Sequence, residues 1–255
     1  MQADIYLIII LFFFIAILYS SVGFGGGSSY LAILSLVGLS FFFIRTNALL
    51  CNLVVVSGSV FLFYRDKWIV LKEVFPFIVT SVPMTFLGSL LKMKESVFFI
   101  ILGIALILSS LALIWKTLQI NIHVETNKKY SNYFSYLLGA FIGFISGIVG
   151  IGGGIFLAPI LNHLRWGKPM KIAALTALFI FANSISGVIG LLFQNTFVIS
   201  LETTIPLLLV VFFGGQIGVR FTLKNKKSEL IKIITGILVF VVGLRILIIK
   251  GLLFL

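Results

Sequence analysis

The chain has 255 residues, of which 60% are hydrophobic and only 10% are charged. Soluble domains are about half apolar and about a quarter charged, so this composition excludes an ordinary water-soluble protein. A net charge of +12 would suggest a nucleic-acid partner in a soluble protein, but here the Lys and Arg residues stand in short clusters between apolar runs, which is typical of membrane topology.

Apolar segments follow one another along the whole chain, and about 20 apolar residues are enough to cross a bilayer as a helix. In chain order the ten predicted segments are Ile5 to Tyr19, Ser28 to Ile44, Ala48 to Tyr64, Val74 to Leu91, Val97 to Trp115, Tyr136 to Val149, Ile155 to Leu164, Ala173 to Phe193, Thr203 to Val219 and Leu230 to Ile249. No basic residue precedes the first segment, so we interpret it as a retained span rather than a signal peptide.

Glycine-rich stretches separate the first segment from the second and the sixth from the seventh, which allows either eight crossings or ten. Cytoplasmic loops concentrate Lys and Arg. Ten crossings place 14 of the 19 basic residues on one side, whereas eight crossings divide them 11 to 8. The charges therefore favour ten crossings, with both termini outside. The basic residues left in predicted outer loops or ends are Arg45, Lys92, Lys94, Arg245 and Lys250.

One of these segments, Ile155 to Leu164, has only ten residues. At 1.5 Å per residue such a helix is about 15 Å long and does not cross the hydrocarbon alone. We therefore expect one or both glycine-flanked helices to be short, tilted or re-entrant, with their irregular backbone packed inside protein.

The glycine-rich stretch itself is repeated. Gly23-Phe24-Gly25-Gly26-Gly27 returns 127 residues later as Gly150-Ile151-Gly152-Gly153-Gly154, which indicates an internal duplication. Each half holds five segments, an odd number, so the second copy is expected to enter the membrane in the opposite direction. We predict an all-α integral membrane protein of two inverted repeats with glycine-broken helices, the usual construction of secondary transporters. The predicted units are residues 1–116, a cytoplasmic connection at 117–132, and residues 133–255.

The two glycine runs are candidates for an anion site near the bilayer midplane. Without a Cβ, glycine lets the backbone turn and lets another group approach closely. The helix that follows each run begins with N–H groups that have no intrahelical partner, and its dipole favours negative charge. Glycines also serve close helix packing, but two copies at equivalent positions favour a site. Asn52 and Asn183 lie at comparable depth in corresponding helices and carry amides suited to an oxyanion.

The ionisable side chains indicate neither proton coupling through carboxylates nor an enzyme active site. All seven carboxylates fall at or beyond segment ends, and the two histidines are far apart in the sequence. A proton-coupled pump usually places Asp or Glu within the bilayer, so any ion coupling is expected to use other groups. An enzyme would need acids, bases or metal ligands that converge at membrane depth. We predict no enzyme, no metal and no cofactor, with a non-transporting scaffold or assembly subunit as the alternative to a transporter.

Several motifs together resemble one known family. They are the paired glycine runs, Thr46-Asn47 after the first, Thr176-Ala177-Leu178-Phe179 after the second, and the run from Gly214 to Arg220. In these features the chain resembles the TauE/SafE family of bacterial membrane permeases, associated with sulfite and organosulfonate export, from about Tyr6 to Ile249. Many members have a proline after each glycine run. Here Pro159 follows the second run, whereas Ala32 stands after the first.

The resemblance implies a multi-pass transporter of the bacterial plasma membrane that carries a small anion such as sulfite, sulfoacetate or thiosulfate by alternating access. Its partners would be this anion and membrane lipids, without nucleic acid; the identity of a coupling ion is left open, and so is a homodimer. The predicted substrate-binding residues are Gly25, Gly26, Gly27, Ser28, Asn47, Asn52, Gly152, Gly153, Gly154, Thr176 and Asn183. The predicted structural residues are Gly23, Thr46, Gly150, Pro159 and Arg220.

Overall fold

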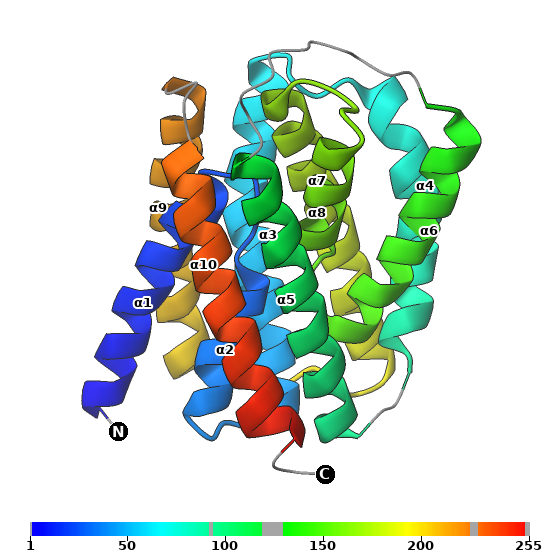
Figure 1. The fold of residues 1–255 in the computed structure, drawn as a ribbon. Coiled ribbons are helices and arrows are strands. Elements are labelled where there is room, and N and C mark those ends of the chain that lie inside the picture. Colours follow the sequence, from blue (N-terminus) through cyan, green and yellow to red (C-terminus); the bar gives the residue numbers. More distant parts are fainter. Residues whose placement is uncertain (1, 92–93, 119–129, 225–228, 253–255) are drawn as a thin grey trace.

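The computed structural model describes residues 2–91, 94–118, 130–224 and 229–252, and these contain helices but no strands (Figure 1). The all-α class predicted from the sequence is confirmed. The helices are α1 (Gln2–Ser20), α2 (Gly27–Leu36), α3 (Phe41–Arg65), α4 (Leu71–Ser89), α5 (Glu95–Leu118), α6 (Asn132–Val149), α7 (Gly154–His163), α8 (Pro169–Phe193), α9 (Leu201–Lys224) and α10 (Glu229–Ile246), with a π-helical turn at Leu247–Leu252.

The helices differ in whether they are long enough to cross a membrane. Within the described residues, α3, α4, α6, α8 and α9 are long and apolar enough to cross a bilayer by themselves. Helices α2 and α7 have only ten residues each, and each follows a glycine run. Both therefore have the short length that was expected of the glycine-flanked helices.

The predicted boundary between the second and third segments is wrong. Instead of a helix from Ser28 to Ile44, α2 ends at Leu36 and the chain turns at Gly38, where φ is +75°. Helix α3 then begins at Phe41, with the Ser40 hydroxyl accepting a hydrogen bond of 3.4 Å from the Phe43 N–H. The apolar run continues across this turn, so hydropathy alone does not reveal it.

The same error misplaced Arg45. A positive charge within apolar sequence is usually a sign of a loop, and Arg45 was expected in one. It lies instead in the second turn of α3 and is buried.

Helices of the two halves pack in matching pairs. Helix α4 packs along α6 as α9 packs along α1, and α8 contacts α4 as α3 contacts α9. The closest approaches also match: a Cβ at Gly88 would lie 2.3 Å from the Phe144 carbonyl oxygen, and one at Gly218 would lie 2.3 Å from the Ile17 carbonyl oxygen. Figure 1 shows α1 rising from the end that carries both termini, while α6 descends toward it.

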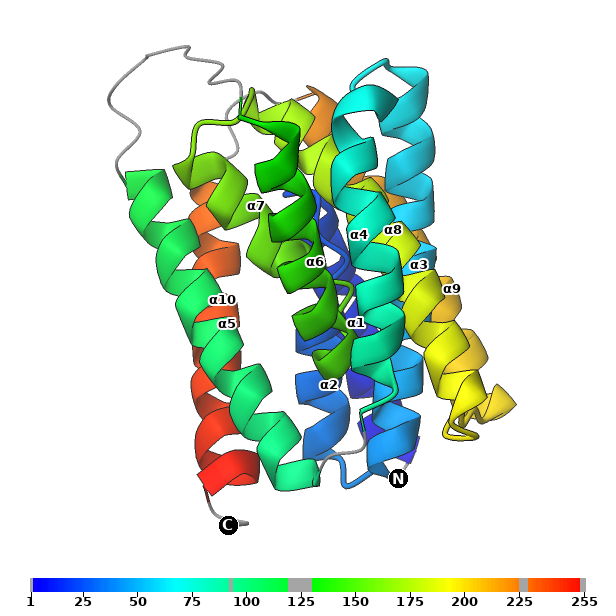
Figure 2. The same cartoon turned by 90° about the vertical axis from the view of Figure 1, so that its right-hand side faces the viewer.

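The centre of the molecule is formed by α3 and α8, which contact each other and are the most buried of the five long spans. Helices α5 and α10 lie side by side along one flank, against α7 and α2 respectively (Figure 2). This arrangement places Asn52 of α3 and Asn183 of α8 near the middle of the two central helices, where both are fully buried.

Candidate functional site

The first glycine run ends α1 with a Schellman motif. The Phe24 N–H donates to the Tyr19 carbonyl at 2.8 Å, and the Gly23 N–H donates to the Ser20 carbonyl at 3.1 Å. Gly23 has a φ of +85°, which glycine adopts without a Cβ penalty. The rings of Tyr19 and Phe24 lie 6.3 Å apart and supply the apolar contact that often accompanies this motif. Three residues after Gly23, Gly26 has a φ of +86° and precedes α2.

The second run repeats this backbone. Gly150 ends α6 with a φ of +70°, and its N–H donates to the Ser146 carbonyl at 2.7 Å. Gly153, three residues later, has a φ of +77° and precedes α7. Gly152 is also left-handed at +75°, which has no parallel at Gly25. We call residues 23–27 the first break and residues 150–154 the second break. Each pairs a helix-ending glycine with a helix-starting one.

Asn52 connects the two breaks. Its side-chain oxygen accepts a hydrogen bond of 2.8 Å from the Gly27 N–H at the start of α2. Its side-chain nitrogen donates a hydrogen bond of 2.9 Å to the Ile151 carbonyl in the second break. A Cβ at Gly25 would lie 2.1 Å from the Asn52 oxygen, and one at Gly27 would lie 2.3 Å from its nitrogen, so this contact requires both glycines. The breaks therefore face each other across a single buried amide.

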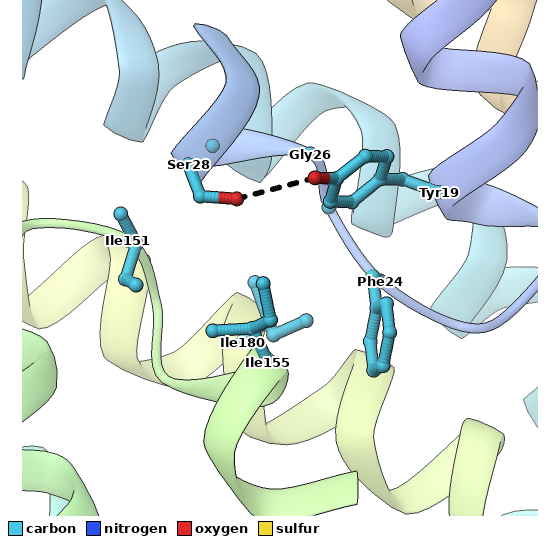
Figure 3. A pocket seen from close by; sticks show the side chains of 9 residues that line it. Tyr19, Phe24, Gly26, Ser28, Ile151, Ile155 and Ile180 are labelled. Atoms are coloured by element: carbon cyan, nitrogen blue, oxygen red, sulfur yellow. Dashed lines mark hydrogen bonds between the residues drawn. The ribbon is translucent and has the colours of Figure 1, made fainter. Parts of the chain in front are cut away.

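A small cavity lies between the breaks (Figure 3). Its volume is about 10 Å³, close to the minimum for one water molecule. The Tyr19 hydroxyl on its wall hydrogen-bonds to the Ser29 hydroxyl at 2.6 Å and to the Ser28 hydroxyl at 3.5 Å. The residues that line the cavity are Tyr19, Phe24, Gly25, Gly26, Gly27, Ser28, Ile151, Ile155 and Ile180. In this conformation the cavity is too small for a sulfur oxyanion.

Several buried polar atoms of the second half have no hydrogen-bond partner among the described residues. Among the described residues, the Asn183 side-chain nitrogen and the hydroxyls of Ser146, Thr176 and Ser184 are buried without a hydrogen-bond partner. Three of these side chains border the break: an atom of Ser184, Ser146 or Thr176 lies within 3.0 Å of the Cβ position of Gly152, Gly153 or Gly154, respectively. Buried polar groups are normally satisfied. This cluster is therefore a place where a ligand rich in oxygen would gain hydrogen bonds.

The two halves differ at their central amides. Asn52 has both its side-chain oxygen and its nitrogen hydrogen-bonded to backbone. In Asn183 the oxygen instead accepts from the Ser81 hydroxyl at 2.9 Å, and the nitrogen is free. Within the described part of the chain, no side chain caps the start of α7, whereas Asn52 accepts from the first N–H of α2. The polar groups of the second half are thus more available to a ligand than those of the first.

The other predicted residues have separate environments. The Asn47 amide donates to the Phe43 carbonyl of its own helix at 2.9 Å, and its side-chain oxygen has no partner among the described residues. The Thr46 hydroxyl accepts from the Val198 N–H at 3.2 Å, which is a structural link between α3 and the loop before α9. Pro159 is buried inside α7, and Arg220 is exposed on α9. Neither residue lines the cavity.

The sequence interpretation missed two residues near the second break. Ser146 was not distinguished from other small residues of its helix. Arg45 was assigned to a loop, but its side chain reaches the end of α6, where one terminal nitrogen donates to the Gly147 carbonyl at 2.7 Å. The sequence did contain a signal that Arg45 is not in a loop. Arg45 directly follows the apolar run Phe41 to Ile44 and precedes Thr46, so no glycine, proline or other typical turn residue stands beside it.

Long apolar helices in this arrangement define a multi-pass membrane protein. The chain belongs to the sulfite exporter TauE/SafE family, and the sequence model of this family matches residues 8–246. It is 32% identical over 240 residues to the probable membrane transporter protein y4hK of Sinorhizobium fredii, covering 93% of this chain and 96% of the relative. It is also 32% identical over 110 residues, 40% of each chain, to the probable membrane transporter protein MJ0441 of Methanocaldococcus jannaschii. No solved structure matches the chain.

Proposed function

We propose that the protein is a secondary transporter that moves a small sulfur-containing oxyanion, such as sulfite, sulfoacetate or thiosulfate, across the plasma membrane of a bacterium. The membrane-transporter class follows from the family; the substrate and the mechanism are our proposal. The observation that carries it is the Asn52 amide, which joins the two breaks beside a cavity that both of them line. Transporters commonly bind substrate where two repeats meet and helices are broken.

The donors at this place suit an oxyanion. A sulfur oxyanion carries acceptor oxygens and negative charge, and helix N-termini favour both. The start of α7 supplies such a terminus, and the Thr176 side chain borders it, with a hydroxyl that has no partner among the described residues. On the opposite wall, the Tyr19 and Ser28 hydroxyls are able to donate in the same way. Within the described part of the chain, no carboxylate lines the cavity to repel an anion.

Alternating access is proposed because the cavity is too small to hold the anion in this conformation. An oxyanion enters only if the two breaks move apart, and this separation would break or shift the hydrogen bond between Asn52 and Ile151. We propose that the two halves form the inverted repeats and rock against each other about the contact between α3 and α8. Both termini are proposed to lie outside the cell, at the end shown at the bottom of Figure 1.

The proposal is tested with the purified full-length chain in liposomes. Vesicles loaded with sulfite, and diluted into labelled sulfite, should exchange label faster than vesicles without protein. Unlabelled thiosulfate and sulfoacetate should compete if they share the site, whereas a neutral solute such as glycerol should not. Exchange no faster than in empty vesicles, across sulfite, thiosulfate and sulfoacetate, would refute the proposed substrate class and favour a non-transporting subunit.

A further inference from the structure

Arg45 is a buried cation in the second turn of α3. Only 3% of the surface of Arg45 is exposed. One terminal nitrogen donates to the Gly147 carbonyl, and within the described part of the chain its Nε atom has no hydrogen-bond partner. Arg45 is therefore held in place while one of its donors remains free.

Among the described residues, no carboxylate forms an ion pair that balances this charge. The ion pairs between described residues include Arg65 with Asp66 at 3.1 Å and Lys171 with Glu73 at 2.5 Å, both at partly exposed helix ends. None of the described carboxylates forms an ion pair with Arg45. A buried charge without a counterion is costly, and ionisable residues inside membrane proteins usually mark pathways for charged substrates.

A purely structural role accounts for only part of this environment. The Gly147 carbonyl belongs to the last turn of α6, and the negative end of a helix dipole stabilises a cation there. The Phe98 ring, whose centroid lies 6.0 Å from the guanidinium carbon, adds a weak cation–π contact. Neither neighbour carries a full negative charge, and neither satisfies Nε. Among the described residues, Arg45 is thus left without an anionic partner for its charge and without an acceptor for Nε.

Arg45 lies beside the second break. Its Nε atom lies 3.2 Å from the Cβ position of Gly150, the residue that ends α6. The next residue, Ile151, lines the cavity and accepts from Asn52. Helix α3 begins at the end of the molecule that carries both termini, so Arg45 lies toward that end relative to Asn52 on the same helix (Figure 1).

The first break has no such charge. At the corresponding place, Gly23 packs against Ala173 near the start of α8, with a Cβ position 2.6 Å from the Ala173 Cβ. A small apolar residue in one half thus faces an arginine in the other. Since a packing requirement alone would be met by a small residue, as it is at Ala173, the charge at Arg45 calls for another reason.

We propose that Arg45 forms an anion subsite beside the second break, which takes the oxyanion between the central cavity and the side of the termini. This subsite rests on the proposed transport of oxyanions. A guanidinium presents its donors in a planar fork that matches two oxygens of an oxyanion, and such charge-assisted bonds are strong. The subsite would hold a substrate at one entrance only.

Binding is tested by thermal unfolding of the purified full-length chain in sulfite and in chloride of equal ionic strength. Wild type and Arg65→Gln, the matched arginine at the exposed end of the same helix, should melt at a higher temperature in sulfite. In Arg45→Gln most of that difference should be lost, and Arg45→Lys should keep less than half of it. If Arg45→Gln melts lower in both salts by the same amount and keeps the wild-type difference, Arg45 is only a helix cap and the subsite is overturned.

Measurements of sulfite flux distinguish a failure of the Arg45 subsite from a failure of the proposed transport function. Arg45→Gln should raise the KM for sulfite roughly tenfold, the factor that one lost charge-assisted bond gives, with a smaller change in maximal rate. Arg65→Gln should change neither. Absence of flux in wild type would refute the transport proposal, while the melting difference alone would decide the subsite. If Arg45→Gln does not fold, Arg45→Lys decides the question. The guanidinium subsite is overturned if Arg45→Lys has the same melting-temperature difference between sulfite and chloride as wild type and the same KM for sulfite.

Discussion

The side-chain nitrogen of Asn52 donates a hydrogen bond of 2.9 Å to the carbonyl of Ile151, so a residue of the first half holds the backbone of the second. The other side of the same amide accepts from Gly27. A movement that separates the two breaks would therefore have to break or shift a hydrogen bond of this side chain. Asn52 is the point at which stability and transport can be tested together.

Asn52→Leu keeps the size of the side chain but removes both hydrogen bonds. The Gly27 N–H and the Ile151 carbonyl would then be buried without partners, at a cost of about 1–3 kcal/mol each. We expect a clear drop in melting temperature and sulfite exchange at the level of empty vesicles. The control is Asn162→Leu, because the Asn162 amide only donates to the Ala158 carbonyl in its own helix. Wild-type exchange by Asn52→Leu would contradict the role of Asn52.

The sequence allowed both breaks to be located because their chemistry is local. A glycine at a left-handed position needs no partner to be recognised, and the duplication doubles the signal, so Gly23, Gly26, Gly150 and Gly153 were all identified. In the structure all four glycines have a positive φ, between +70° and +86°. The turn at Gly38 was missed, since a single glycine inside a long apolar stretch has no second copy to distinguish it.

Side-chain partners were not predictable in the same way. Asn52 and Asn183 look equivalent in the sequence, but their partners come from residues about 100 positions away, such as Ile151 and Ser81. Only the packing of α3, α8 and α4 brings these groups together. The burial of Arg45 has the same origin, because its partner carbonyl at Gly147 belongs to the other half.

Alanine at the helix-starting glycines should separate strain from function. Gly26, Gly153 and Gly38 all have positive φ, so alanine at each costs about 1–2 kcal/mol in the backbone. At Gly153 the new methyl would also lie 3.0 Å from Phe179 and Ser146, and at Gly26 it would lie 2.9 Å from the Tyr30 ring, whereas nothing lies within 4 Å at Gly38. We expect sulfite exchange to be lost in Gly26→Ala and Gly153→Ala but retained in Gly38→Ala.

Expression and melting temperature must be measured beside this exchange. A comparable drop in melting temperature for Gly38→Ala and Gly153→Ala would show that the loss of exchange in the latter is not a folding defect. Exchange at the wild-type rate in both Gly26→Ala and Gly153→Ala would instead favour a packing role for the glycine runs and a non-transporting subunit.

Glycines at helix crossings are predicted to affect stability rather than substrate affinity. A Cβ at Gly143 would lie 2.5 Å from the Ser81 carbonyl oxygen, and one at Gly218 would lie 2.3 Å from the Ile17 carbonyl oxygen. Because backbone cannot move away as a side chain can, we expect Gly143→Ala and Gly218→Ala each to cost about 1–3 kcal/mol. Gly167→Ala, whose nearest neighbour is the Lys171 side chain at 3.5 Å, is the control. Unchanged melting temperatures in both variants would contradict the close packing of α4 on α6 and of α9 on α1.

The orientation in the membrane can be tested with single cysteines, because Cys51 is buried and is the only cysteine in the chain. In a Cys51→Ala background, Lys72→Cys would place a thiol at the start of α4, and Val198→Cys would place one in the loop before α9, at the opposite end of the molecule (Figure 1). Both positions are exposed. The excess of Lys and Arg predicts that the end with Lys72 faces the cytoplasm.

In intact cells, a membrane-impermeant maleimide should therefore label Val198→Cys at once, whereas Lys72→Cys should be labelled only after permeabilisation. The reverse pattern would show that both termini lie inside, and Arg45 would then lie on the cytoplasmic side of the second break. Labelling of both cysteines in intact cells would contradict the opposite placement of the two ends. The result thus decides from which side of the membrane an oxyanion would first meet Arg45.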